Sequence, residues 1–181
     1  MVAQLVQMVE ELKRCERAGA TTACLMQIYV YIDTLAYLGM PATKDKNTRS
    51  DFIEWVDSYL KADSQQSYQY RGKDVYGARC ALLHTFSSEA DFHVQNQDAI
   101  KFGYHDGGQH AYDPKINPTL AIIGTAFFIN DFVIAVTNFL QDVKRRIADE
   151  SEKNILQARL NKILNTVPFP SSVSENTGQI A

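Results

Sequence analysis

The segment from Leu120 to Leu140 constrains the fold most strongly, because it is almost continuously apolar and long enough to span a bilayer. Asn130 and Asp131 lie near its middle, however, and an acidic residue at that depth opposes membrane insertion by roughly 2.5–3.5 kcal/mol. A second apolar run, residues 21–38, contains Asp33. We therefore expect both runs to be central helices of a bundle, buried on most sides, and expect no membrane span.

Composition points to one soluble domain. The chain has 181 residues, of which 45% are hydrophobic and 22% charged. Its net charge of -3 argues against non-specific binding of nucleic acid over the whole surface, but leaves a local basic site open. Cys15, Cys24 and Cys80 are odd in number and form no CxxC pair, which is typical of reduced thiols in a cytoplasmic protein. The amphipathic pattern at the N-terminus is unlike a secretory signal.

Apolar spacing and end signals predict five or six helices. The expected helices cover residues 2–17, 21–38, 48–60, 73–86, 118–150 and 152–164. Between 87 and 117, Phe92–Val94 and Ala99–Tyr104 flank a polar turn, which predicts a short β-hairpin. The sequence therefore predicts an all-α helical bundle with one small β-hairpin insertion. We expect a single domain over residues 1–167 and a flexible tail over residues 168–181.

The helix expected at 73–86 carries Arg79 and His84 in an otherwise apolar segment. The planar fork of arginine suits phosphate, and histidine can accept or give a proton near neutral pH. Five helical positions advance about 500°, so the two side chains should leave the helix about 140° apart. Within one chain they could meet only by reaching around the helix. Two copies facing each other across a two-fold axis could line one cleft with both pairs.

This motif and its setting resemble the HEPN superfamily of small helical-bundle proteins. Tyr76–Thr85 is similar to the family's pattern of an arginine, four to six residues and a histidine, late in a helical domain. Elsewhere the chain agrees with the family only in its helix order. The resemblance implies a HEPN-like fold and a homodimer with a composite site at its interface. For many members it also implies metal-independent cleavage of RNA, with neither metal nor cofactor.

Under this resemblance, His84 is the general base or acid at the RNA 2′-hydroxyl, and Arg79 stabilises charge on the phosphate. The products would be a 2′,3′-cyclic phosphate and a 5′-hydroxyl. Two positions depart from the family. Cys80, a weak hydrogen-bond partner, stands where active members often have asparagine. Phe86 stands where toxin members often have a tyrosine, and it has no hydroxyl to modify.

Asp33 and Asp131 each interrupt an apolar helix and therefore need a polar partner. We expect one of them to contact Arg79 or His84 and so to support the site. A purely structural interpretation is also open, in which Arg79 pairs with one of these acids and His84 complements the helix end. Two further alternatives are a non-catalytic HEPN-like module that binds RNA or another protein, and an unrelated small-ligand-binding bundle. The last predicts an enclosed apolar pocket away from Arg79.

The irregular region holds a loose cluster of possible metal ligands, His93, His105, Asp106 and His110. Their spacing fits no known metal site, so we expect exposed loop histidines. Tyr68, Tyr70 and Arg71 could stack on nucleic-acid bases, although packing of such a loop against the bundle is the commoner outcome. The sequence contains no glycine-rich phosphate-binding loop of the P-loop or dinucleotide type.

Overall fold

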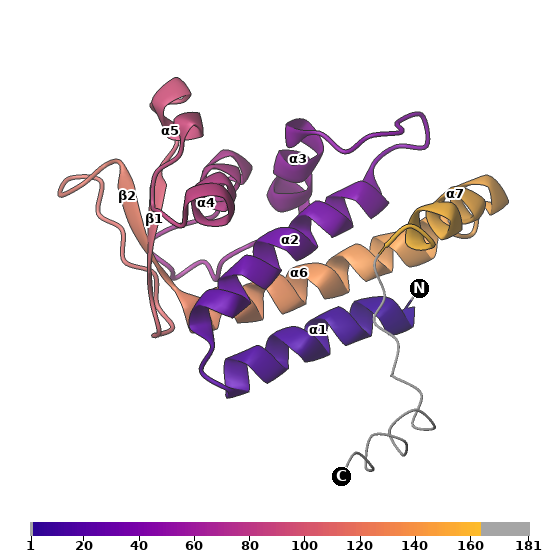
Figure 1. Ribbon diagram of the computed structural model, residues 1–181, viewed down its shortest axis with the longest axis horizontal. Helices are drawn as coiled ribbons and strands as arrows, with labels where there is room; N and C mark the ends of the chain where they lie inside the picture. The colour runs from indigo at the N-terminus through magenta and orange to yellow at the C-terminus, as the bar shows by residue number, and fades with distance from the viewer. Residues whose placement is uncertain (1, 164–181) are drawn as a thin grey trace, which may run out of the picture.

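The computed structural model describes residues 2–163, which form seven helices and two strands (Figure 1). In chain order these are α1 (Val2–Arg17), α2 (Thr21–Gly39), α3 (Arg49–Tyr59), α4 (Gly72–Thr85), α5 (Asp91–Gln95), β1 (Lys101–His105), β2 (Leu120–Gly124), α6 (Thr125–Arg146) and α7 (Glu150–Leu160). The predominance of helices confirms the predicted helical fold. The tail expected at 168–181 lies outside the described residues.

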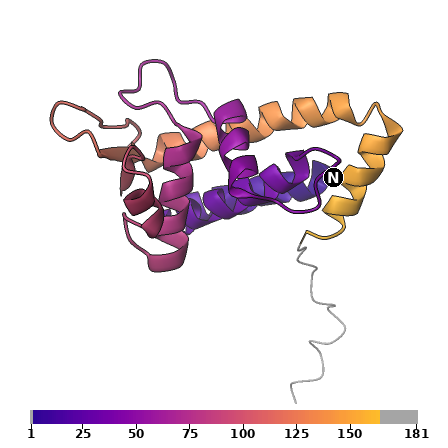
Figure 2. The same ribbon diagram turned by 90° about the horizontal axis from the view of Figure 1, so that it is seen from above.

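Helix α2 is the centre of the molecule. It packs against α1, α3, α4, α6 and α7. The long helices α1, α2 and α6 lie alongside one another, α3 and α4 lie to one side of them, and the strands and α7 occupy opposite ends (Figures 1 and 2). The buried side chains of α2 are Cys24, Leu25, Ile28, Tyr29, Ile32, Leu35, Ala36 and Leu38. The expectation that this apolar run is a central, mostly buried helix is therefore confirmed.

Helix α6 differs from the expectation, because it is buried along one face only. Phe128, Phe132 and Phe139 point into the core, whereas Phe127 and Ile134 are 40% and 50% exposed. By length and composition α6 is the one helix within residues 2–163 that could cross a membrane, and 44% of its most apolar window is buried. A core helix meets the same criterion.

The apolar run that begins at Leu120 is not one helix. Leu120–Gly124 forms β2, and α6 begins only at Thr125. A Cβ atom on Gly124 would lie 2.3 Å from the backbone oxygen of Gly108, so only glycine fits where this loop approaches. Gly124 thus divides a short buried strand, which contains the β-branched pair Ile122–Ile123, from the helix. The prediction of a helix over 118–150 was therefore wrong for residues 118–124.

The predicted β-hairpin was also wrong. β1 pairs with β2 in parallel, with Lys101 opposite Leu120 and His105 opposite Gly124. A parallel pair needs a long crossover, which residues 106–119 provide. The segment expected as the first hairpin strand is the helix α5. There Nδ1 of His93 accepts the backbone N–H of Ala90 and closes the first turn.

Asp74 anchors the segment before α4 to the sheet. Its fully buried carboxylate accepts hydrogen bonds from the Tyr68 hydroxyl at 2.6 Å and from Nε and Nη2 of Arg71 at 2.6 and 2.8 Å. It also accepts the backbone N–H of Ile100 at 2.9 Å, next to β1. One carboxylate therefore fixes the start of α4 relative to the sheet.

We expect Asp74→Asn to lower the free energy of unfolding by about 2–3 kcal/mol in urea denaturation. Loss of one partner of a buried pair costs about 3–5 kcal/mol, and this cost is reduced here because the Arg71 side chain is half exposed. Asp98→Asn is the matched control. Its carboxylate is 69% exposed and paired with Lys73, so its effect should stay within about 0.5 kcal/mol. Equal effects of the two variants would contradict the anchoring role.

Candidate functional site

Arg79 and His84 meet at the surface of a single chain. Nη1 of Arg79 lies 3.0 Å from Nε2 of His84, and both side chains come from α4. Asp33 on α2 holds the other side of the guanidinium, because its Oδ2 accepts from Nε at 2.9 Å and from Nη2 at 2.8 Å. His84 is exposed, whereas the side chains of Arg79 and Asp33 are 21% and 30% exposed. The three residues form a polar unit that opens to solvent at the histidine.

The hydrogen bond between Arg79 and His84 fixes the state of the imidazole in this geometry. Arginine carries only donors, so Nε2 of His84 must be the acceptor. The ring is therefore neutral, with its proton on Nδ1. Partial burial acts to lower the pKa of Arg79, but hydrogen bonding and the charge of Asp33 outweigh it and raise this pKa. A permanent cation thus lies beside a nitrogen that is free of a proton.

This contact corrects the prediction that the two side chains diverge within one chain. Helical geometry separates their points of attachment, but the long arginine side chain spans that separation. Asp33 draws the guanidinium toward α2 and occupies Nε and Nη2, which leaves Nη1 directed at His84. The expected contact between an intrahelical acid and Arg79 is present, and it is made by Asp33.

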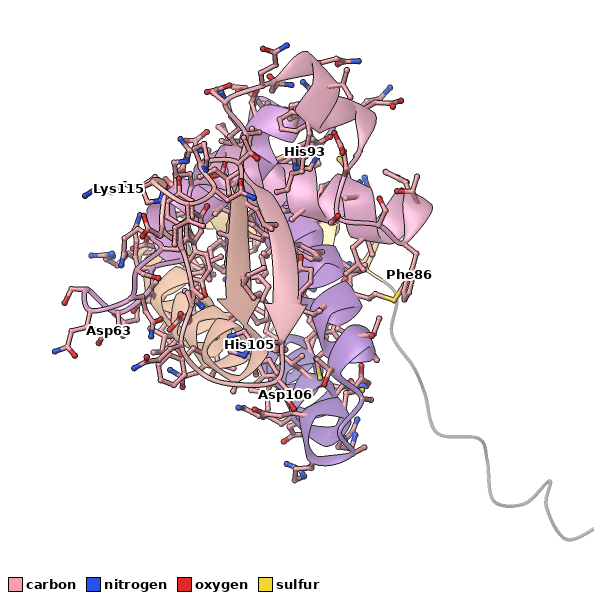
Figure 3. The ribbon with its side chains drawn as sticks, turned by 90° about the vertical axis from the view of Figure 1, so that its left-hand side faces the viewer. Asp63, Phe86, His93, His105, Asp106 and Lys115 are labelled. Carbon is pink, nitrogen blue, oxygen red and sulfur yellow. The ribbon has the colours of Figure 1, made fainter. Side chains whose placement is uncertain are left out.

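Cys80 directly follows Arg79 in the chain, and Phe86 lies two positions after His84. Burial raises the pKa of Tyr76, and the neighbouring Cys80 thiol adds to this rise, so Cys80 lies beside Tyr76. Phe86 ends α4 in the left-handed conformation, with φ 51°, and its ring is 68% exposed. Its backbone N–H closes the last turn on the carbonyls of Ala81 and Leu82. Figure 3 shows this ring standing away from the fold, beside the end of α4.

A groove begins at His84 and runs between α4 and α5. It has a volume of about 560 Å³. Its lining residues are Arg49, Tyr76, Cys80, His84, Thr85, Ser87, Glu89, Ala90, Asp91, Phe92, Val94 and Gln95. Arg49 was not singled out from the sequence. It comes from α3, and its guanidinium lies over the rings of Tyr76 at 5.4 Å and Phe92 at 5.1 Å.

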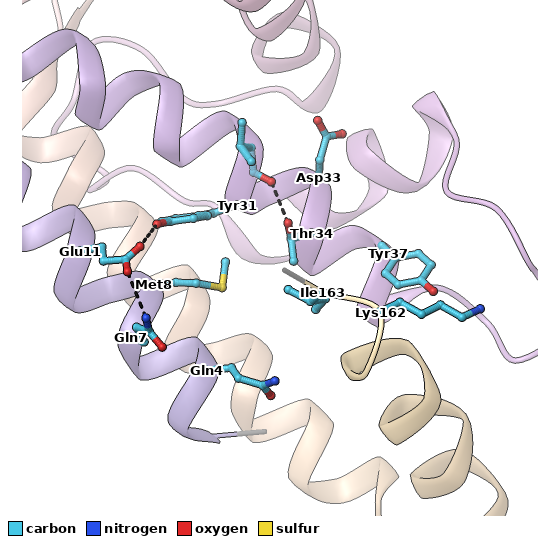
Figure 4. Close-up of a pocket in the computed structure, with 11 residues that line it drawn as sticks. Gln4, Gln7, Met8, Glu11, Tyr31, Asp33, Thr34, Tyr37, Lys162 and Ile163 are labelled. Atoms are coloured by element: carbon cyan, nitrogen blue, oxygen red, sulfur yellow. Dashed lines mark hydrogen bonds between the residues drawn. The ribbon is translucent and has the colours of Figure 1, made fainter. Parts of the chain in front are cut away.

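A second cavity, of about 540 Å³, lies between α1, α2 and the residues after α7 (Figure 4). Its wall includes Met8, Val30 and Ile163, together with Asp33. Nearby, Glu11 accepts the hydroxyl of Tyr31 at 3.1 Å. A small-ligand-binding bundle predicts a pocket away from Arg79, but this cavity shares Asp33 with the Arg79 ion pair.

Asp131 belongs to a different, buried network. Its Oδ2 accepts the hydroxyl of Tyr70 at 3.1 Å, and that hydroxyl lies 2.6 Å from Nε2 of His110. Nδ1 of His110 accepts the backbone N–H of Gly124, so the neutral ring carries its proton on Nε2 and donates it to Tyr70. Burial raises the pKa of Asp131 to about 6. Burial, with a smaller contribution from His105, lowers the pKa of His110 to about 4.

The remaining potential metal ligands are dispersed (Figure 3). His93 and His110 are 4% and 5% exposed, which corrects the expectation of exposed loop histidines. His105 bonds to the carbonyl oxygen of Gln109 at 2.7 Å and lies with Asp106 at the end of β1, whereas His93 lies on α5. Residues 2–163 contain no group of three or more His, Cys, Asp or Glu side chains that could hold a metal ion.

The tyrosine-rich loop before α4 packs against the bundle. Tyr68 and Tyr70 are 3% and 7% exposed, and Arg71 is bound to Asp74. The two tyrosine rings are therefore not available to stack on nucleic-acid bases. Their acceptor partners, Asp74 and Asp131, lie on helices that follow the loop in the chain.

Comparison with known proteins yields no relative. No family model, no curated protein and no solved structure matches this chain. The interpretation of the site therefore depends on its own geometry and on the resemblance of the Arg79–His84 motif.

The buried network of Tyr70, Asp131 and His110 predicts that the stabilities of two variants change with pH in opposite directions. The pKa of Asp131 is raised in the fold, so this residue stabilises the folded state as pH falls from about 6 to 4. The pKa of His110 is depressed in the fold, so this residue destabilises the folded state as pH falls from about 6.5 to 4. As pH falls from about 6 to 4, the free energy of unfolding of Asp131→Asn should drop by about 2–3 kcal/mol relative to that of the wild type. Over the same change, the free energy of unfolding of His110→Gln should rise by a similar amount relative to the wild type.

Urea denaturation at a series of pH values measures both differences. In the double variant, Asp131→Asn with His110→Gln, the two differences should largely cancel. Single variants whose stability curves run parallel to that of the wild type would show that neither group is perturbed by burial.

Proposed function

We propose that this chain is a HEPN-like homodimer that cleaves RNA without a metal ion. The contact between Nη1 of Arg79 and Nε2 of His84 carries the proposal, because it joins a phosphate-binding cation and a proton acceptor at one exposed point. The groove that starts at His84 offers room for a nucleotide of the substrate on one side of this point.

In the proposed reaction, Nη1 of Arg79 turns from His84 to the bound phosphate, and the Nε2 that it releases accepts the proton of an RNA 2′-hydroxyl. The 2′-oxygen forms a bond to phosphorus, and the bond from phosphorus to the 5′-oxygen breaks. Arg79 stabilises the charge that develops on the phosphate oxygens, while Asp33 keeps its guanidinium in place. The products are a 2′,3′-cyclic phosphate and a 5′-hydroxyl.

The leaving 5′-oxygen needs a proton from a second group, and the proposed homodimer supplies it. With two copies related by a two-fold axis, the partner's His84 would act as the general acid, in the protonated form that it can adopt only when its own Arg79 has released Nε2. An exposed apolar strip supports this interface. Met26 and Val30 lie on the same face of α2 as Asp33, at helical spacing, and are 37% and 47% exposed. The three unpaired thiols, Cys15, Cys24 and Cys80, favour a cytoplasmic location.

Two other functions use the same surfaces without turnover. In a non-catalytic module, Arg79 and the groove would bind RNA or a protein partner. In a ligand-binding bundle, the cavity between α1 and α2 would hold a small molecule, for which its volume of about 540 Å³ is sufficient, although it includes Asp33 and so is not separate from Arg79.

Cleavage of single-stranded RNA in the presence of EDTA tests the proposal. Wild type should cleave and leave 2′,3′-cyclic phosphate ends, whereas His84→Ala should reduce the rate by at least about 100-fold, as expected for loss of a general base. The dimer and the melting temperature should be unchanged, because His84 is exposed.

His105→Ala is the matched control, since it removes another histidine outside the groove. Its cleavage rate should equal that of wild type. Equal activity of wild type and His84→Ala would place any cleavage at another site or in a contaminant. Dimerisation without any cleavage would favour the non-catalytic module.

A further inference from the structure

We propose that the groove between α4 and α5 is a subsite for single-stranded RNA, in which Arg49 binds a further phosphate of the strand that reacts at Arg79 and His84. The inference rests on the proposed function for the identity of the reacting phosphate. The binding that it predicts can be measured without any cleavage.

Arg49 is held ready for a ligand by its surroundings. It is the first residue of α3 and lies within the capping box in which Asp51 accepts the backbone N–H of Thr48 at 2.9 Å. Its guanidinium rests on two aromatic rings, those of Tyr76 and Phe92. Within residues 2–163 no carboxylate forms an ion pair with Arg49, although the residue is exposed. A planar cation that is fixed in orientation and lacks a counter-charge suits a phosphate.

The groove joins this cation to the proposed reaction centre. His84 and Arg49 both line it, and His84 in turn contacts Arg79. The hydroxyls of Thr85 and Ser87, 2.9 Å apart, lie on the same lining and offer hydrogen bonds to a sugar or phosphate. The volume of about 560 Å³ is within the range of sites that hold small molecules such as a nucleotide.

The groove also contains two acidic side chains, Glu89 and Asp91, which could repel an anionic ligand. Glu89 is neutralised by Lys101, whose Nζ lies 2.9 Å from its carboxylate. Asp91 has no ion-pair partner in the described part of the chain, so it alone opposes an anionic ligand. Arg49 and Asp91 should therefore affect RNA binding in opposite directions.

Fluorescence anisotropy with a 2′-O-methyl RNA oligonucleotide tests this inference, because the missing 2′-hydroxyl prevents the proposed cleavage. Arg49→Gln should weaken binding about tenfold and reduce the slope of log K against log salt by about 0.7, the value for one phosphate contact in a single strand. Arg49→Lys should keep the slope, since it keeps the charge. Asp91→Asn should tighten binding several-fold.

Arg145→Gln is the matched control, because this arginine is 78% exposed on α6 and lies outside the groove. It removes the same charge and should leave affinity and salt slope unchanged. Absence of RNA binding by wild type, or equal effects of Arg49→Gln and Arg145→Gln, would overturn the inference. If Arg49→Gln fails to fold, Arg49→Lys and Asp91→Asn decide the question.

The outcomes separate this inference from the proposed function. Binding that depends on Arg49, in a protein that cleaves no RNA, would retain the subsite and reject catalysis. Cleavage that depends on His84 but is indifferent to Arg49, with unchanged binding, would retain catalysis and reject the subsite.

Discussion

The ion pair between Asp33 and Arg79 is the contact on which the candidate site depends, and it ties α4 to the central helix α2. α2 is the central helix, and an acid within its apolar run requires a partner. Arg79 provides that partner from α4 and uses two of its nitrogens to do so. The third, Nη1, is thereby aimed at His84. Because both groups of the pair are partly exposed, the contact contributes more to orientation than to stability.

The same requirement shapes the less regular part of the molecule, residues 60–124. There the buried acid Asp74 accepts the hydroxyl of Tyr68, and Asp131 on α6 accepts the hydroxyl of Tyr70. These bonds hold a segment without helix or strand against the start of α4 and the sheet. In this region polar contacts between distant residues therefore add to the aromatic and aliphatic packing that also holds the long helices.

How far the sequence could predict the structure depended on whether the relevant signal was local. Periodicity and end residues located α1 and α2 to within one residue, and the need of Asp33 for a partner led to its contact with Arg79. The parallel sheet could not be predicted, because the pairing of β1 with β2 is a tertiary event. The break at Gly124 depends on the approach of Gly108, which no local pattern records. Arg49 was missed because its groove is assembled from three helices.

The central claim is that Asp33, Arg79 and His84 form one oriented unit with a proton-free Nε2. Long-range ¹H–¹⁵N NMR correlation of the His84 ring at pH 8 measures this directly, because it distinguishes the two neutral tautomers. The account predicts the Nδ1-protonated tautomer in wild type and its loss in Asp33→Asn, where the guanidinium is no longer held. A ring protonated on Nε2 in wild type would contradict the account, since that nitrogen could not then accept from Arg79.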